Sequence, residues 1–169
     1  MNDTHDKPVW PPLETIAPIR YRKATAEDAT DLASRVRAID IFELALTSDE
    51  PVLPRIHRAI EMSDESWAVL EDDRLVAIFG VCRSPIGYSP WLLGTDRLDA
   101  HLARCTKDAK QWLSSIKRDG ILLGAVVWEQ NHGGLRWIER LGFRALGHMP
   151  KPDGSHSGLL GFAIGVNHV

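Results

Sequence analysis

The sequence lacks the short motifs that most metal and catalytic sites require. Its two cysteines, Cys82 and Cys105, form no C-x-x-C pair, which favours two buried thiols in a reducing compartment over a zinc cluster. No G-x-S-x-G, H-E-x-x-H or phosphate-binding P-loop sequence occurs. Seven histidines are scattered along the chain without a pair four residues apart, and His101 with Cys105 would supply only two ligands. We therefore predict no metal site.

Strong charge of one sign and long apolar runs are missing as well. The chain has 20 Lys and Arg against 23 Asp and Glu residues, whereas a nucleic-acid-binding domain usually carries a basic patch. No apolar run approaches the roughly 20 residues of a membrane helix, and the N-terminus resembles no signal peptide. We expect one domain in these 169 residues, with neither a membrane nor a sequence-specific nucleic acid as partner.

Residues 1–18 are rich in proline and form neither a helix nor a central strand, because proline lacks a backbone donor and has a fixed φ. We predict an extended N-terminal arm that lies on its own domain or on a neighbouring chain. Trp10 stands between the prolines, where an isolated aromatic side chain is a plausible interface anchor. The predicted partner-binding residues are Trp10, Pro11 and Pro12.

The first half of the remaining chain, residues 19–169, alternates between strand and helix patterns. Thr25 and Asp28 form a capping box, after which apolar residues recur at helical spacing up to Ile39. A second helix is predicted next to Pro54. The expected elements are a strand at 19–22, helices after Thr25 and at 55–62, and a three-stranded meander at 67–70, 75–81 and 90–94, with Pro90 at the first position of its strand.

The second half begins with a long amphipathic helix over 98–116, which Lys117, Arg118 and Gly120 end. One stripe of this helix is expected to face the sheet: Leu102, Trp112, Leu113 and Ile116. The continuous apolar run 121–127 predicts a central strand buried on both faces. A short helix at 135–141 and two strands at 143–149 and 159–166 complete the domain. This order of elements requires a mixed α/β sheet flanked by helices.

The segment 126–143 resembles the C-terminal motif of the GNAT N-acetyltransferases. In that motif a buried strand ends at an asparagine, a helix follows, and Leu-Gly-Phe closes it. Asn131, Leu141, Gly142 and Phe143 match residue by residue. The resemblance implies a single GNAT-like α/β (α+β) domain over 19–169, with a mixed, mostly antiparallel sheet. In an active member it implies acetyl-CoA as cofactor, with Asn131 among the residues that bind it.

Two departures from the family put catalysis in doubt. The stretch 94–101 lacks the glycines with which the family binds the pyrophosphate of acetyl-CoA, and it adds Asp96 and Asp99, which repel phosphate. Asp96 is instead predicted to cap the following helix. The family's general-acid tyrosine is replaced by Ile138, which transfers no proton. We therefore predict no catalytic residue, no cofactor and no acetyl-CoA binding at sub-millimolar concentration, with no rescue by Asp96→Gly alone.

The segments 90–93, 107–112 and 131–143 also resemble small internal virion proteins of short-tailed phages, which are GNAT-like and share these losses. That resemblance implies a non-catalytic component of a phage virion, internal or at the head–tail junction, made in the cytoplasm of the host bacterium. Its partners would be other virion proteins or copies of itself, bound through the arm. Two alternatives stay open: a divergent acetyl-CoA-dependent N-acetyltransferase acting on a small amine or a protein, and a host regulatory protein of similar fold.

Overall fold

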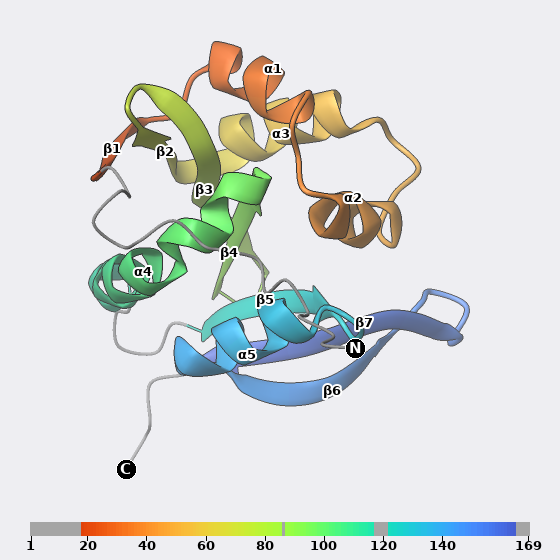
Figure 1. The fold of residues 1–169 in the computed structure, drawn as a ribbon. Coiled ribbons are helices and arrows are strands. Elements are labelled where there is room, and N and C mark those ends of the chain that lie inside the picture. Colours follow the sequence, from red (N-terminus) through yellow and green to blue (C-terminus); the bar gives the residue numbers. More distant parts are fainter. Residues whose placement is uncertain (1–17, 86, 117–121, 165–169) are drawn as a thin grey trace, which may run out of the picture.

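The computed structural model describes residues 18–85, 87–116 and 122–164 (Figure 1). Seven strands form one sheet in the order β1-β2-β3-β4-β5-β7-β6. The sheet is mixed and mostly antiparallel, and helices flank it, as the sequence predicted. The proposed partner-binding residues Trp10, Pro11 and Pro12 lie outside the described residues. None of the helices in the described ranges is both long and apolar enough to cross a membrane.

The first half of the sheet contains β1 (Ile19–Lys23), β2 (Ser63–Glu71), β3 (Arg74–Ser84) and β4 (Gly87–Gly94). Each strand pairs antiparallel with the next, which confirms the predicted meander. Helix α1 (Ala26–Ala33) follows β1 and begins with the predicted capping box, in which both the Thr25 and the Asp28 side chains bond to the backbone.

Three helices, not the two predicted, connect β1 to β2. Helix α1 ends at Ala33, and a separate helix α2 (Ala38–Ala45) follows it. The sequence pattern had instead predicted one helix that continues to about Ile39. The signal for α2 is tertiary, because the buried Asp40 on it accepts a hydrogen bond from the backbone N–H of Gly94. Helix α3 (Val52–Met62) starts before the predicted residue 55 and includes Pro54 in its first turn, where no intrahelical N–H bond is needed.

Strand β4 contradicts the prediction that Pro90 begins it. The strand begins at Gly87, and Pro90 lies in its middle, paired with Val81 of β3. A proline is tolerated there because the other edge of β4 is unpaired at this point. In the described ranges, β5 (Leu122–Trp128) pairs parallel with β4 only at Gly87–Leu122 and Tyr88–Leu123. Beyond these two pairs the strands diverge, and Figure 1 shows them pointing apart.

The second half of the sheet contains β5, β6 (Arg144–Pro150) and β7 (His156–Ile164), with α5 (His132–Arg140) between β5 and β6. Strand β5 lies between β4 and β7, so the predicted central position is confirmed. The prediction that it is buried on both faces is wrong at Val126, which is 48% exposed. Val126 lies on the part of β5 from which β4 has diverged. The predicted helix end at Lys117, Arg118 and Gly120, the first strand residue Ile121 and residues 165–166 fall outside the described residues.

Side chains pack on both faces of the first half-sheet. Helices α1 and α3 cover one face around Leu32, Ile56 and Ile78, all fully buried. The short 3-10 helix η2 (Asp96–His101) and α4 (Leu102–Ile116) cover the other face through Leu98 and Cys105. A third cluster joins the end of α4, where Leu113 is buried, to α5 and β5. Of the predicted stripe on α4, Leu113 is buried, and Leu102, Trp112 and Ile116 are half-buried.

Candidate functional site

A cavity of about 530 Å³ occupies the gap between the diverging strands β4 and β5. Its volume lies within the range of small-molecule sites. Both faces of β4 line it: Trp91 and Leu93 belong to the face that α1 and α3 cover, and Leu92 to the face that η2 and α4 cover. Residues of α2 line it on the first face and residues of α4 on the second. The cavity therefore crosses the sheet.

Glu43 of α2 lies at one mouth of the cavity. Its Oε1 accepts hydrogen bonds from the backbone N–H of Trp128 at 2.9 Å and from Nδ2 of Asn131 at 2.8 Å. Burial raises the pKa of Glu43, and this effect exceeds the lowering by the two hydrogen bonds. No hydrogen bond to Oε2 occurs in the described part of the chain. This oxygen is thus available to a ligand in the cavity.

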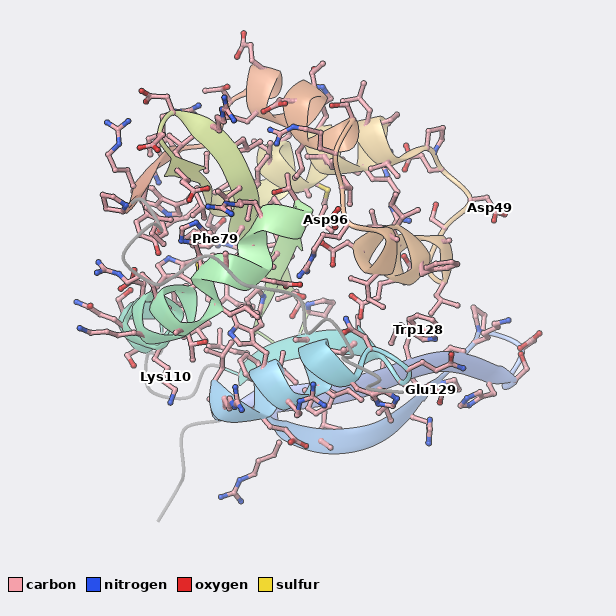
Figure 2. All side chains as sticks on the ribbon, viewed as in Figure 1. Asp49, Phe79, Asp96, Lys110, Trp128 and Glu129 are labelled. Atoms are coloured by element: carbon pink, nitrogen blue, oxygen red, sulfur yellow. The ribbon has the colours of Figure 1, made fainter. Side chains whose placement is uncertain are left out.

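Asn131 holds this mouth together. Its Oδ1 accepts a hydrogen bond from the Gly134 N–H at 2.8 Å and so caps α5, while its Nδ2 donates to Glu43. Figure 2 shows Trp128 below α2, next to Glu129. The ring of Trp128 stacks on Phe42 of α2, with centroids 5.7 Å apart. The residue that the sequence singled out, Asn131, therefore lines the cavity and orients a carboxylate that the sequence did not suggest.

A second feature of α2 is a mostly buried ion pair that ties it to the end of β4. The guanidinium of Arg37 bonds to Asp40 at 2.8 Å and, through its other terminal nitrogen, to Asp99 of η2 at 3.2 Å. The second oxygen of Asp40 accepts the Gly94 N–H at 2.8 Å. Asp99, which the sequence suggested as a repulsive charge, is thus partly neutralised by Arg37.

The start of η2 is the position at which the sequence resemblance placed a diphosphate site, and its geometry does not suit that group. The N-cap is Thr95, not Asp96 as predicted, and no side chain caps the helix; Thr95 instead donates its hydroxyl to the carbonyl of Val76. The N–H groups of Gly94 and Thr95 are already bonded within the protein. Asp96 and Asp99 are exposed at the same turn. A diphosphate bound here would therefore meet few free hydrogen-bond donors and two carboxylates.

The α4 mouth of the cavity carries a hydrogen-bonded group of three residues. The Tyr21 hydroxyl donates to Asp108 at 2.7 Å, and Arg104 bonds to the same carboxylate at 2.7 Å. Partial burial alone would raise the pKa of Asp108, but the bonds from Arg104 and Tyr21 outweigh it and lower the pKa. Burial raises the pKa of the Cys105 thiol to about 11, so this cysteine is protonated and unsuited to nucleophilic attack.

The remaining residues of the sequence motif follow the C-terminal end of α5. Leu141 follows the helix, Gly142 has φ of +98°, which suits glycine, and Phe143 is buried with Ile138 against β5 and β7. Ile138 lines the cavity and is 8% exposed. It provides an apolar wall at the place of the family's acid.

The structure also brings together three residues that the sequence left apart. Glu129, at the end of β5, contacts His156 of β7 at 3.0 Å and His148 of β6 at 3.5 Å. The histidines are eight residues apart and meet only through the β6–β7 hairpin. Histidines eight residues apart do not match the four-residue spacing of a helical pair, so the sequence did not indicate this pair across two strands. Glu43 was missed for a similar reason, since 88 residues separate it from Asn131.

No protein-family model and no curated protein matches the sequence. Solved structures do match. Ard1 from Thermoplasma volcanium aligns with a TM-score of 0.64 and 13% identity over 88% of this chain and 99% of that one. Aminoglycoside 6'-acetyltransferase type Ii gives 0.62 and 15% over 89% and 99%. An acetyltransferase of the GNAT family from Bacillus anthracis gives 0.60 and 14% over 89% and 96%. The chain therefore has the fold of the GNAT acetyltransferases.

Proposed function

We propose that this protein is an N-acyltransferase that takes the acyl–pantetheine arm of a thioester donor into the cavity between β4 and β5. The observation that carries the proposal is the path of this cavity through the sheet. A reaction that joins two substrates needs room for both, and here residues of α4 line the cavity on one side of the sheet and residues of α2 on the other. The solved structures of similar fold, which include acetyltransferases, support the same class of reaction.

The described residues suit one end of such a donor and not the other. The middle of the cavity is apolar, with Trp91, Leu92 and Val126 on its walls, which suits the methylene groups of the arm. The start of η2 offers bonded N–H groups and two carboxylates where a diphosphate would lie. We infer that the nucleotide part of coenzyme A contributes little to binding, and that the acyl arm alone determines affinity.

Glu43 is the residue we propose for proton transfer at the α2 mouth. An acyl thioester supplies an electrophilic carbonyl, and a free amine is needed to attack it. An amine arrives mostly as ammonium at neutral pH. The unbonded Oε2 of Glu43 can accept its proton, and the raised pKa brings the carboxylate closer to the range of an effective general base. Trp128 N–H and Asn131 hold the other oxygen and so fix the orientation.

Calorimetric titration with acetyl-CoA and with S-acetylpantetheine tests the proposal. We expect the two dissociation constants to agree within about threefold, because the diphosphate would meet few free donors and two carboxylates. Val126→Trp should fill the cavity and weaken both by at least about tenfold, whereas Leu146→Trp on the exposed face of β6 should change neither. Coenzyme A binding that is about thirtyfold tighter than that of the pantetheine thioester would contradict our account of η2.

Activity is tested separately, by acyl transfer to a panel of primary amines. Glu43→Gln should keep donor binding and lower turnover by about 10²-fold or more, as for loss of a general base. Equal turnover of Glu43→Gln and the unchanged protein would remove Glu43 from the mechanism and leave the cavity proposal standing.

A second candidate is the non-catalytic component of a phage virion. Two features are consistent with a loss of catalysis: Asp40 and Val76 already accept the N–H groups of Gly94 and Thr95, and Ile138 forms an apolar wall where the resemblance expects an acid. The virion location, and the contacts of the arm with copies of the chain or other virion proteins, rest on the sequence resemblance. Binding of neither thioester at 1 mM, as for roughly −4 kcal/mol or weaker, would favour this candidate.

A further inference from the structure

Glu129, His148 and His156 form a cluster outside the cavity, which we call the strand-end cluster. One ligand-type atom from each residue lies within 4.8 Å of the other two. Oε2 of Glu129 is 3.0 Å from Nε2 of His156 and 3.5 Å from Nδ1 of His148. The two imidazole centroids are 4.9 Å apart. Two side chains of the β6–β7 hairpin and one from the turn after β5 thus converge on one point of the surface.

Backbone hydrogen bonds fix the positions from which these side chains start. The Glu129 N–H donates to the Gly158 carbonyl of β7 at 2.9 Å, which joins the end of β5 to the hairpin. The turn between the histidines is closed by Lys151 N–H to the Ser155 carbonyl at 2.8 Å. Next to His156, the Ser157 hydroxyl donates to the carbonyl of Met149. The cluster therefore stands on a hydrogen-bonded scaffold.

We propose that the strand-end cluster binds a zinc ion through His148, His156 and Glu129. Two imidazoles and one carboxylate are a ligand set that zinc takes in three-ligand sites, which leave a fourth position open. Ligands at 2.0–2.1 Å in a tetrahedron lie about 3.3 Å from one another, and the two contacts of Glu129 are already near this spacing. Only the two histidine nitrogens must approach each other.

The exposure of the cluster permits this small movement. The side chains of His148 and His156 are 60% and 56% exposed, and that of Glu129 is 30% exposed. Exposed side chains change rotamer without disturbing a packed core. The same exposure limits affinity, because no buried partners orient the imidazoles. We therefore expect zinc binding in the micromolar range, weaker than at a buried structural site.

The competing explanation is an ion pair between Glu129 and protonated histidines. Both explanations use the same contacts, and they differ in what the second histidine does. An ion pair needs only one imidazolium against the carboxylate, whereas a zinc site loses a ligand if either imidazole is removed. The two single histidine variants therefore separate the explanations.

Zinc titration of the chelator-treated full chain at pH 7.5 tests the proposal by calorimetry. We expect one equivalent to bind, and His148→Ala and His156→Ala each to weaken binding by about tenfold or more. His132→Ala removes an exposed histidine from α5, outside the cluster, and should leave binding unchanged. Absence of binding, or binding that survives in the His148→Ala/His156→Ala double variant, would overturn the proposal.

Substitution with cobalt gives a second measurement that does not depend on affinity alone. Co²⁺ in a four-coordinate site of two imidazoles, a carboxylate and water should give visible absorption bands that six-coordinate aqueous cobalt lacks. These bands should be absent from the double variant and from Glu129→Ala, and present in His132→Ala. Identical spectra for the unchanged chain and the double variant would also overturn the site.

Discussion

The two halves of the sheet differ in how completely their side chains are buried. In the first half, helices cover both faces of β2 to β4, and Leu32, Ile56 and Ile78 are fully buried. In the second half, every residue of β6 is exposed, and Val126 on β5 is half-open. Among the residues that the structure describes, two residue pairs join the halves through β4 and β5. The difference indicates that β6 and the free edge of β5 add little to the core, although the second half has a buried cluster of its own around Leu123, Phe143 and Phe162.

The largest expected effect is a core truncation that tests this division directly. Ile78→Ala in β3 should lower the free energy of unfolding by about 4 kcal/mol, because a fully buried side chain leaves a cavity. Leu146→Ala in β6 should cost less than about 0.5 kcal/mol, since that side chain is 68% exposed. Urea unfolding followed by tryptophan fluorescence measures both. Similar costs for the two changes would show that the halves are equally important to stability.

Truncation at the junction of the halves comes next. The Trp112 ring on α4 meets Phe79 of β3 edge-on, with centroids 4.9 Å apart, and also packs on the cluster of the second half. Trp112→Ala should cost about 3 kcal/mol, at the lower end of the range for large buried residues because the ring is half-buried. Lys110→Ala on the exposed side of the same helix is the control, and a loss below about 1 kcal/mol for Trp112→Ala contradicts the packing.

The tie between α2 and β4 gives a smaller effect. Asp40→Asn keeps an acceptor for the Gly94 N–H but removes the charge that faces Arg37, whose side chain is only 16% exposed. We expect a loss of about 2 kcal/mol, because a mostly buried cation loses its partner. Asp49→Asn, at an exposed position after α2, should be neutral in the same chemical denaturation. If both changes are neutral, α2 is held by its apolar contacts alone.

The smallest expected effect is a pH dependence at Glu43. Burial raises its pKa in the folded state, so between the unfolded value near 4.3 and the folded value the folded chain binds more protons. Stability from this group is therefore present at low pH and lost as pH rises through the folded pKa. Glu43→Gln removes that loss, and its stability relative to the unchanged chain should increase from pH 4 to pH 7. A difference that is flat with pH would show that Glu43 titrates normally.

Local and global features of the fold differed in how far the sequence could predict them. The capping box of Thr25 and the central strand β5 depend on adjacent residues, and both were predicted correctly. Helix α2 was missed because Asp40 stabilises it through Gly94, more than fifty residues away. Val126 was assigned to a buried strand because its letters are apolar, and only the divergence of β4 exposes it. The motif residue Asn131 was found, but its partner Glu43 carries no sequence signal near it.

The position of Pro90 has a consequence for how the chain folds. Two neighbouring parallel strands tend to extend their hydrogen-bond ladder outward from the first pairs that form. On β4 and β5 that process starts at Gly87 and Tyr88. Two residues further on, the growing ladder reaches a residue that has no N–H to offer. Pro90 therefore cannot donate to a longer β4–β5 ladder, and this missing donor favours the gap that holds the cavity over a closed sheet.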